Sequence, residues 1–122
     1  MPTIVRFEDI EAWKEARKLV KVIYDSFPHI KDYNFRDQIQ RAALSIMSNI
    51  AEGFDRGTNK EFIHFLVVAR GSVSEVKSLT YAATDIGYLD RDTLDDISSR
   101  CSKITALLNG FMKYLKTSMR QK

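Results

Sequence analysis

Apolar residues recur at steps of three and four along most of this chain, which is the spacing of amphipathic α-helices. The pattern predicts helices over residues 9–27, 34–53, 58–87 and 91–117, and no segment alternates as a strand would. On the first helix the predicted inward stripe comprises Ile10, Trp13, Ala16, Val20, Ile23, Tyr24 and Phe27; on the fourth it includes Cys101, Leu108 and Phe111. Short connections between such helices predict one domain over residues 1–122, an all-α, antiparallel up-down-up-down four-helix bundle.

Residues at the predicted helix ends agree with these limits. Pro28 cannot continue the first helix, and Asn34 is the predicted N-cap of the second. Thr58 and Glu61 have the spacing of a capping box, in which each side chain satisfies the backbone amide of the other residue. Gly87 is the predicted C-cap of the third helix, because glycine readily adopts the left-handed conformation that often ends a helix.

The third helix contains a glycine near its middle. Gly71 costs about 1 kcal/mol relative to alanine at such a position. A close contact with a neighbouring helix would offset this cost, so we expect tight packing at Gly71. The alternative is that the glycine is merely tolerated there.

A polar stripe follows each of the two central helices. The second helix carries Gln38, Arg41, Ser45, Asn49 and Glu52; the third carries Glu61, His64, Ser72 and Glu75 beside Val68 and Leu79. An antiparallel hairpin places Arg41 opposite residues 71–75, which predicts an Arg41–Glu75 ion pair. A solvated face explains the polar residues, whereas the apolar members favour a subunit interface.

The composition excludes several classes of protein. With 44% hydrophobic and 29% charged residues, the chain is typical of a folded domain and not of a disordered one. Acidic residues near the N-terminus interrupt any signal sequence, and no run approaches the roughly 20 apolar residues that span a bilayer. We therefore expect a cytoplasmic protein with no membrane partner. Cys101 is the only cysteine, and it is predicted to be a buried structural thiol.

No set of residues in the sequence matches a known reaction or metal site. Glu61 and His64 form half of the Glu-x-x-His arrangement of di-metal bundles, which needs a second such motif and two further glutamates. No histidine is placed to activate Cys101, and Gly53 and Gly57 lack the spacing of a phosphate-binding loop. We therefore predict a protein that is not an enzyme and has no catalytic residue, metal or cofactor.

Basic residues point to a binding partner instead. The net charge is +3, and the candidate nucleic-acid contacts are Lys14, Arg17, Lys18 and Lys21 on one face of the first helix, with Lys113, Lys116 and Arg120 near the C-terminus. Rows of cations of this kind can follow the phosphates of a nucleic acid. The alternative is a pair of solvated helix faces, in which lysines near a C-terminus also complement the helix dipole.

Several short motifs resemble those of one protein family. They are Arg41-Ala42-Ala43, Ser45-Ile46, Asn49-Ile50-Ala51-Glu52-Gly53, Lys60-Glu61-Phe62, and Gly71-Ser72 followed by Glu75. With FEDIEAWKEARKLV before them and IGYLD after them, they are similar to the four-helix-bundle family encoded within 23S ribosomal RNA intervening sequences. That family also includes the accessory variability proteins of diversity-generating retroelements. The resemblance extends from Phe7 to Leu115, and Met47 departs from the proline of many relatives.

The resemblance implies a homo-oligomer, namely a ring-like homopentamer of antiparallel bundles. Retroelement members of the family are basic, bind nucleic acid and contact a reverse transcriptase. The family-motif residues, which we expect to serve packing or an interface, are Arg41, Ser45, Asn49, Glu52, Gly53, Gly71, Ser72 and Glu75. The leading hypothesis is a homo-oligomer that binds structured RNA or a ribonucleoprotein through basic faces. The alternative is an oligomeric scaffold that docks a protein partner without touching nucleic acid.

Overall fold

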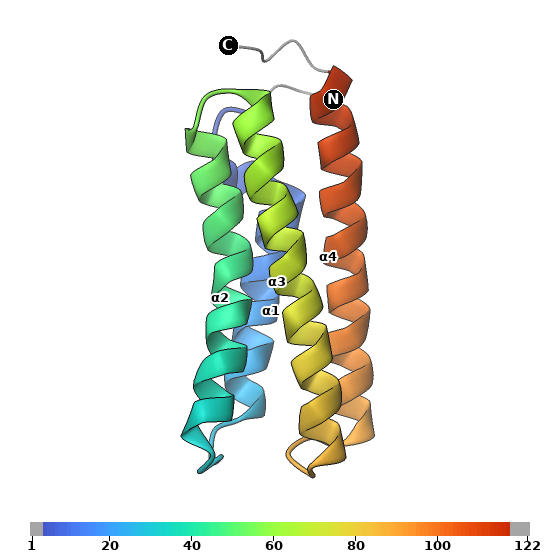
Figure 1. The fold of residues 1–122 in the computed structure, drawn as a ribbon. Helices are drawn as coiled ribbons and strands as arrows, with labels where there is room; N and C mark the ends of the chain where they lie inside the picture. The colour runs from blue at the N-terminus through green and yellow to red at the C-terminus, as the bar shows by residue number, and fades with distance from the viewer. Residues whose placement is uncertain (1–3, 118–122) are drawn as a thin grey trace.

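Four long helices run antiparallel to one another, so that α1 begins and α4 ends at the same end of the molecule (Figure 1). The structure is a computed structural model and describes residues 4–117. A 3-10 turn at Phe7–Asp9 precedes α1 (Glu11–Ser26), α2 (Tyr33–Asp55), α3 (Asn59–Asp85) and α4 (Arg91–Thr117). Helices α1 and α3 each pack against both α2 and α4, so the four helices occupy the corners of a square. The predicted all-α four-helix bundle is confirmed.

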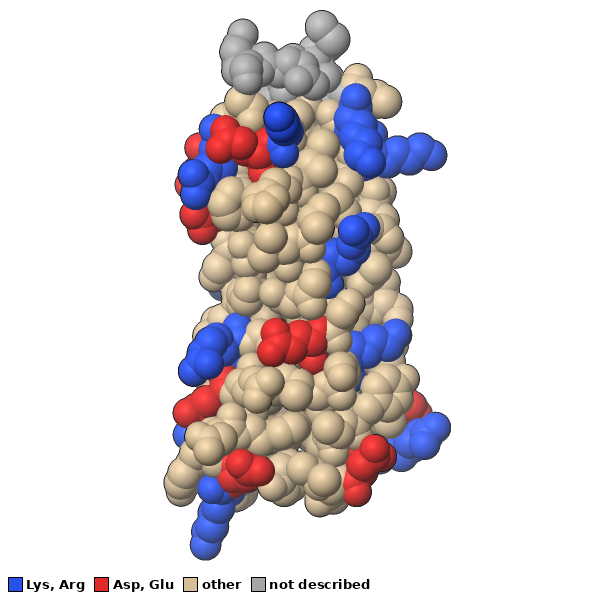
Figure 2. Space-filling view, viewed as in Figure 1, with Lys and Arg blue, Asp and Glu red and all other residues tan. Residues whose placement is uncertain are grey.

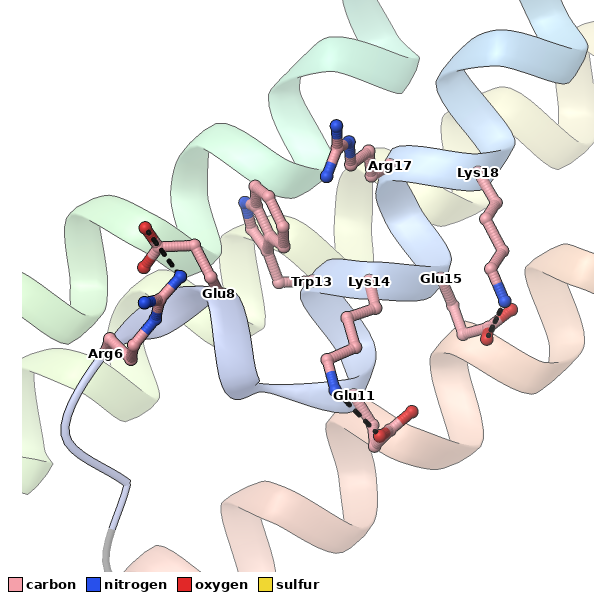
Figure 3. A pocket seen from close by; sticks show the side chains of 8 residues that line it. All are labelled: Arg6, Glu8, Glu11, Trp13, Lys14, Glu15, Arg17 and Lys18. Carbon is pink, nitrogen blue, oxygen red and sulfur yellow. Dashed lines mark hydrogen bonds and ion pairs between the residues drawn. The ribbon is translucent and has the colours of Figure 1, made fainter.

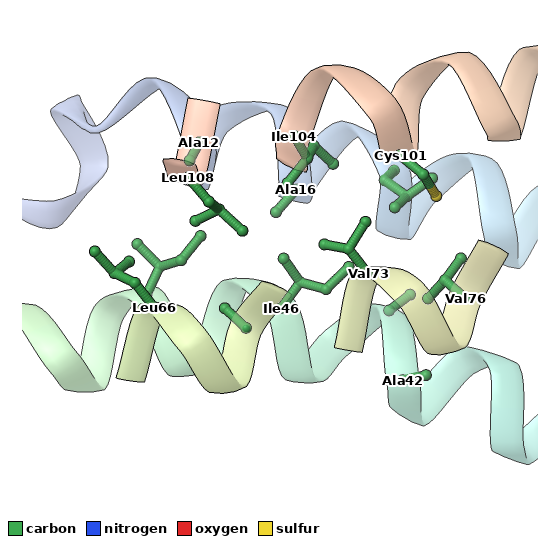
Figure 4. Packing of buried hydrophobic residues seen from close by; sticks show 14 of the residues in the cluster. Ala12, Ala16, Ala42, Ile46, Leu66, Val73, Val76, Cys101, Ile104 and Leu108 are labelled. Carbon is green, nitrogen blue, oxygen red and sulfur yellow. The ribbon is translucent and has the colours of Figure 1, made fainter. Parts of the chain in front are cut away.

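Alanines and larger branched side chains together line the core (Figure 4). Alanines on α1 and α2 let the helices approach closely, and branched side chains from α2, α3 and α4 fill the remaining space. The labelled examples are Ala12, Ala16, Ala42, Ile46, Leu66, Val73, Val76, Ile104 and Leu108, all at most 4% exposed. Cys101 is fully buried in the same cluster, as predicted.

The buried face of α1 is rotated away from the predicted stripe. The buried residues of this helix are Ala12, Glu15, Ala16, Leu19 and Ile23. Tyr24 is 42% exposed, so its predicted inward position is wrong. It follows Ile23 by one residue, which turns it about 100° around the helix. On α4, likewise, Met112 is buried and the neighbouring Phe111 only partly so. On both helices, apolar residues also flank the buried face. The stripe of apolar residues in the sequence is therefore wider than the surface that the neighbouring helices cover.

Asp32 joins the two loops at the end of the bundle opposite the α2–α3 turn. Its Oδ1 accepts a hydrogen bond from the backbone N–H of Phe35 at 3.2 Å, so it caps α2. The prediction of Asn34 as the N-cap is wrong, because Asp32 caps the helix and α2 begins two residues earlier than that assignment requires. The Tyr88 hydroxyl donates to Asp32 Oδ2 at 2.8 Å, and the Tyr88 ring meets the Phe35 ring edge to face. One carboxylate therefore holds the α1–α2 and α3–α4 loops together.

Gly87 ends α3 in the way that the sequence predicts. Its φ is 87°, in the left-handed region where residues with a side chain are strained. The N–H of Gly87 donates to Thr84 O at 3.2 Å, and the N–H of Tyr88 donates to Ala83 O at 2.8 Å. These two bonds form the Schellman motif, which satisfies carbonyls that the end of the helix would leave free.

The α2–α3 turn is anchored to the C-terminal end of α4. Thr58 Oγ1 accepts from the N–H of Glu61 at 3.2 Å, whereas the Glu61 carboxylate accepts from the Thr58 hydroxyl at 3.4 Å. Only one half of the predicted capping box is therefore present among these contacts. Asn59 is buried, and its Nδ2 donates to the Leu115 carbonyl at 2.8 Å. That carbonyl lies in the last turn of α4, where the helix itself supplies no donor.

Gly53 and Gly71 are expected to respond in opposite ways to replacement by alanine. A Cβ on Gly53 would lie 2.6 Å from Phe65 Cβ and 3.0 Å from Phe62 Cδ1, so α2 and α3 would have to move apart. We expect Gly53→Ala to lower the free energy of unfolding by about 1–2 kcal/mol, because overpacking outweighs the gain in helix propensity.

Gly71→Ala is the matched control, since no atom lies within 4 Å of an added Cβ there. It should raise the stability of the monomer by up to about 1 kcal/mol. Urea denaturation of both variants measures the two changes. Equal responses would show that the close approach at Gly53 does not exist.

Candidate binding surfaces

Three polar side chains join α2 to α3 beside the core. Ser45 Oγ and Ser72 Oγ lie 2.9 Å apart across the two helices. Asn49 Nδ2 donates both to Ser45 O at 2.8 Å and to Ser45 Oγ at 2.9 Å. All three residues are half-buried, so their polar groups satisfy one another where water has limited access. These family-motif residues therefore make a packing contact within the chain.

Next to the α2–α3 turn, Glu52 forms an ion pair with Arg56, whose guanidinium group lies over the Phe65 ring. Arg56 Nη2 lies 2.8 Å from Glu52 Oε2, and the guanidinium carbon of Arg56 lies 4.7 Å from the centre of the Phe65 ring. Phe65 is also the residue that Gly53 allows to approach α2. Gly53 and Glu52 thus contribute to the same junction between α2 and α3.

Arg41 and Glu75 do not form the predicted ion pair. Both residues are exposed, and among residues 4–117 neither side chain lies within ion-pair distance of an opposite charge. Ser72 faces α2, and Glu75 follows it by three residues, which turns Glu75 about 60° toward solvent. The Ser45–Ser72 contact places Arg41 level with about residue 76, one residue beyond the predicted range of 71–75, and the rotation of each helix separates the two charges.

Gly71 is likewise not where α3 meets another helix of this chain. It is exposed, and nothing lies within 4 Å of the position of its missing Cβ, so the predicted tight packing is wrong for the isolated chain. Leu44 and Val68 are 40% and 41% exposed on the same side of the hairpin. We call this surface the α2–α3 outer face; it comprises Arg41, Leu44, Ser48, Val68, Gly71 and Glu75.

Carboxylates of the same helix neutralise most of the predicted basic face of α1 (Figure 3). Lys14 Nζ lies 3.4 Å from Glu11 Oε1, and Lys18 Nζ lies 3.2 Å from Glu15 Oε2. Lys21 pairs with Asp25 at 3.0 Å. The fourth cation of this face, Arg17, lies over the Trp13 ring, 5.7 Å from the ring centre. The sequence interpretation considered the cations alone and overlooked the acidic residues one helical turn away.

Glu15 also ties α1 to α4. Its carboxylate lies 3.5 Å from Lys103 Nζ in addition to its contact with Lys18. Burial raises the pKa of Glu15, but hydrogen bonds and attraction from the two lysines outweigh this effect and hold the pKa below its ordinary value. Glu15 is therefore a charged structural bridge at neutral pH, and it removes two lysines from any basic surface.

The cations of α4 are arranged differently. Lys113 and Lys116 are exposed, and no carboxylate among residues 4–117 pairs with them. Arg120 lies outside the described residues. Two cations of α3, which the sequence interpretation missed, lie on the side facing α4: Arg70 Nη1 donates to Asn109 Oδ1 at 2.7 Å, and Lys77 Nζ donates to Ser102 Oγ at 3.3 Å. The available signal was the absence of acidic residues from 62–74 and 97–117.

The described residues contain no group of three or more metal-ligating side chains that could hold an ion. His64 contacts the Phe65 ring edge to face, on the outside of the bundle. Burial raises the pKa of Cys101 to about 11, only partly opposed by the charge of Lys77. The thiol is therefore held in its protonated form. Within residues 4–117, none of the helices is long and apolar enough to cross a membrane.

Comparison with known proteins identifies both a family and a fold. Residues 8–110 match the model of the family described as 23S rRNA-intervening sequence protein. Among solved structures, the chain is similar to a protein of unknown function from the S23 ribosomal protein family of Bacteroides thetaiotaomicron VPI-5482. The TM-score is 0.79 at 21% sequence identity, over 84% of this chain and 98% of that one, which establishes a shared fold. No curated protein matches the chain.

Cys101 is expected to resist alkylation in the folded protein. A pKa of about 11 lowers the thiolate fraction at pH 8 by about a hundredfold relative to an ordinary thiol, and burial blocks access as well. Reaction with iodoacetamide at pH 8 should be at least that much slower in the native chain than in urea. A Ser99→Cys, Cys101→Ala variant, whose thiol is exposed on α4, serves as the control and should react at an ordinary rate. Equal rates for the two positions would contradict the buried thiol.

Proposed function

This chain belongs to the family of 23S rRNA-intervening sequence proteins, and we propose that it is a non-enzymatic, self-associating helical bundle whose assembly presents basic surfaces to structured RNA or a ribonucleoprotein. The proposal has two parts, self-association and RNA binding, and different surfaces of the bundle support them. The alternative is a self-associating scaffold that docks a protein and never touches RNA.

The α2–α3 outer face supports self-association. It contains two partly exposed aliphatic side chains, Leu44 and Val68, and an exposed glycine in mid-helix that no contact within the chain requires. Arg41 and Glu75 lie on this face with opposite charges and no partner among the described residues. A second copy of the chain offers complementary charge to both of them. Apolar area that a monomer leaves in water would also be buried by such contact.

RNA binding is supported by cations that have no carboxylate partner. Four of them, Arg70, Lys77, Lys113 and Lys116, lie on α3 and α4, whereas the lysines of α1 are already paired. An unpaired cation binds a phosphate without first breaking an ion pair. Repetition of such cations around an oligomer would strengthen binding, because each further contact forms at a high effective concentration.

Leu44→Glu combined with Val68→Glu should dissociate the oligomer. Two carboxylates on the outer face would be desolvated in an interface between copies, which is costly without cationic partners. Light scattering on a size-exclusion column should show an oligomer for the native chain and a monomer for this variant. Tyr24→Glu is the matched control, because Tyr24 is equally exposed on α1 and should leave the oligomer intact. A native chain that elutes as a monomer, or a double variant that remains oligomeric, would refute this assignment.

Protein purified at low salt should carry nucleic acid if the RNA part is correct. Binding through phosphates strengthens as salt falls, so the oligomer peak should show excess absorbance at 260 nm that ribonuclease removes. A clean oligomer at low salt would favour the protein-docking scaffold instead.

A further inference from the structure

We propose that the seam between α3 and α4, and not the face of α1, is the surface that binds RNA, and that it takes an unpaired segment of the strand. This inference rests on the RNA-binding part of the proposed function. The α3–α4 seam is defined by Arg70, Lys77 and Tyr81 of α3 and by Lys113 and Lys116 of α4.

Neutral groups hold the two cations of α3 in place along the seam. Arg70 donates to the amide oxygen of Asn109, and Lys77 donates to the hydroxyl of Ser102. Each bond crosses from α3 to α4, so it fixes the position of the cation without cancelling its charge. Both groups keep further donors for a phosphate, since guanidinium has five N–H bonds and ammonium has three.

The cations of α4 continue the same row. Lys113 follows Asn109 by four residues and Lys116 follows it by seven, which places both on the helix face that Asn109 turns toward α3. At about 1.5 Å of rise per residue, Lys77 and Arg70 lie about 10 Å apart along the seam. By the same measure, Lys116 lies about 10 Å beyond the level of Asn109, which Arg70 contacts. The row is thus straight and about 20 Å long.

Within residues 4–117 no acidic residue lies in the seam itself, because Glu75, which is level with the row, belongs to the α2–α3 outer face. Neither residues 62–74 of α3 nor residues 97–117 of α4 include an aspartate or glutamate. Asp85 and Asp95 lie toward the α3–α4 loop, and Asp95 is paired with Arg91 at 3.6 Å. Figure 2 shows Lys and Arg side chains spaced along the edge formed by α3 and α4; acidic side chains lie near the lower end of this edge and, at mid-height, on the face beside it. Among the described residues, no acidic side chain therefore separates the cations of the row from one another.

Tyr81 favours an unpaired RNA strand over an acidic protein segment. It follows Lys77 by one helical turn and is 50% exposed, so part of its aromatic side chain is accessible beside the cations. Cations that follow a backbone, with an aromatic ring on which a base can stack, are the features that bind single-stranded nucleic acid. A base inside a duplex could not reach this ring.

Two variants with identical changes in charge test the seam against α1. The seam variant replaces Arg70, Lys77, Lys113 and Lys116 with glutamine, and the α1 variant replaces Lys14, Arg17, Lys18 and Lys21 with glutamine. Fluorescence anisotropy with a labelled, unstructured 12-nucleotide RNA measures the affinity from 50 to 200 mM salt. We expect the seam variant to lose about tenfold or more in affinity and to reduce the slope of log K against log salt by about three. The α1 variant should lose less than about threefold, since paired lysines release few counterions.

Further variants separate loss of binding from loss of folding. Lys113→Gln with Lys116→Gln removes two exposed side chains that make no contact with an acid in residues 4–117, and should give about half the change in slope. Tyr81→Ala should weaken binding of the single strand about tenfold while leaving the salt slope unchanged. Thermal unfolding and light scattering of each variant show whether fold and assembly persist.

The outcomes distinguish this inference from the proposed function. If the native chain does not bind the RNA at 50 mM salt, RNA binding fails and the inference fails with it, while self-association stands on its own test. If the native chain binds but the α1 variant loses as much as the seam variant, the RNA-binding proposal stands and the seam is wrong. Tighter binding of a duplex, or of a poly-glutamate peptide, than of the single strand would also overturn the inference.

Discussion

The close approach of α2 and α3 at Gly53 is the constraint on which the other surfaces depend. A missing side chain lets Phe65 come within 2.6 Å of where a Cβ would be, and this fixes how the two helices align. Ser45 then meets Ser72, eight residues along α2, and Asn49 completes the contact. Because this junction decides which sides of α2 and α3 face each other, it also decides which sides remain outside.

The described basic residues of the bundle fall into two groups that composition does not distinguish: some are paired with carboxylates and others are not. On α1, each lysine has an acidic neighbour one turn away, and Glu15 uses two lysines to hold α1 against α4. On α3, by contrast, Arg70 and Lys77 contact neutral oxygens of α4 and keep their charge. A net charge of +3 therefore describes two quite different surfaces, one balanced and one free to attract an anion.

The two free surfaces lie on different sides of α3 and do not compete. The α2–α3 outer face has aliphatic side chains and single charges of each sign, which suits contact with another copy of the chain. The α3–α4 seam has cations of one sign, which would repel a second copy but attract a polyanion. One helix can thus take part in both assembly and binding, and an oligomer could present several seams at once.

The four helices, the end of α3 at Gly87, the burial of Cys101 and the family could all be predicted from the sequence. Each depends on local period, local backbone geometry or short motifs. The packing of the helices against one another was needed to show that Gly53, and not Gly71, is the close contact, and that Arg41 and Glu75 stay apart. It also showed that Arg70 and Lys77 of α3 are held by neutral groups of α4, whereas the lysines of α1 are paired with carboxylates. The physical reason is that a turn of about 60° around a helix moves a side chain from a neighbour to solvent. The spacing of apolar residues locates the buried face of a helix less precisely than about 60°. Contacts between side chains of different helices are therefore known only once all four helices are packed together.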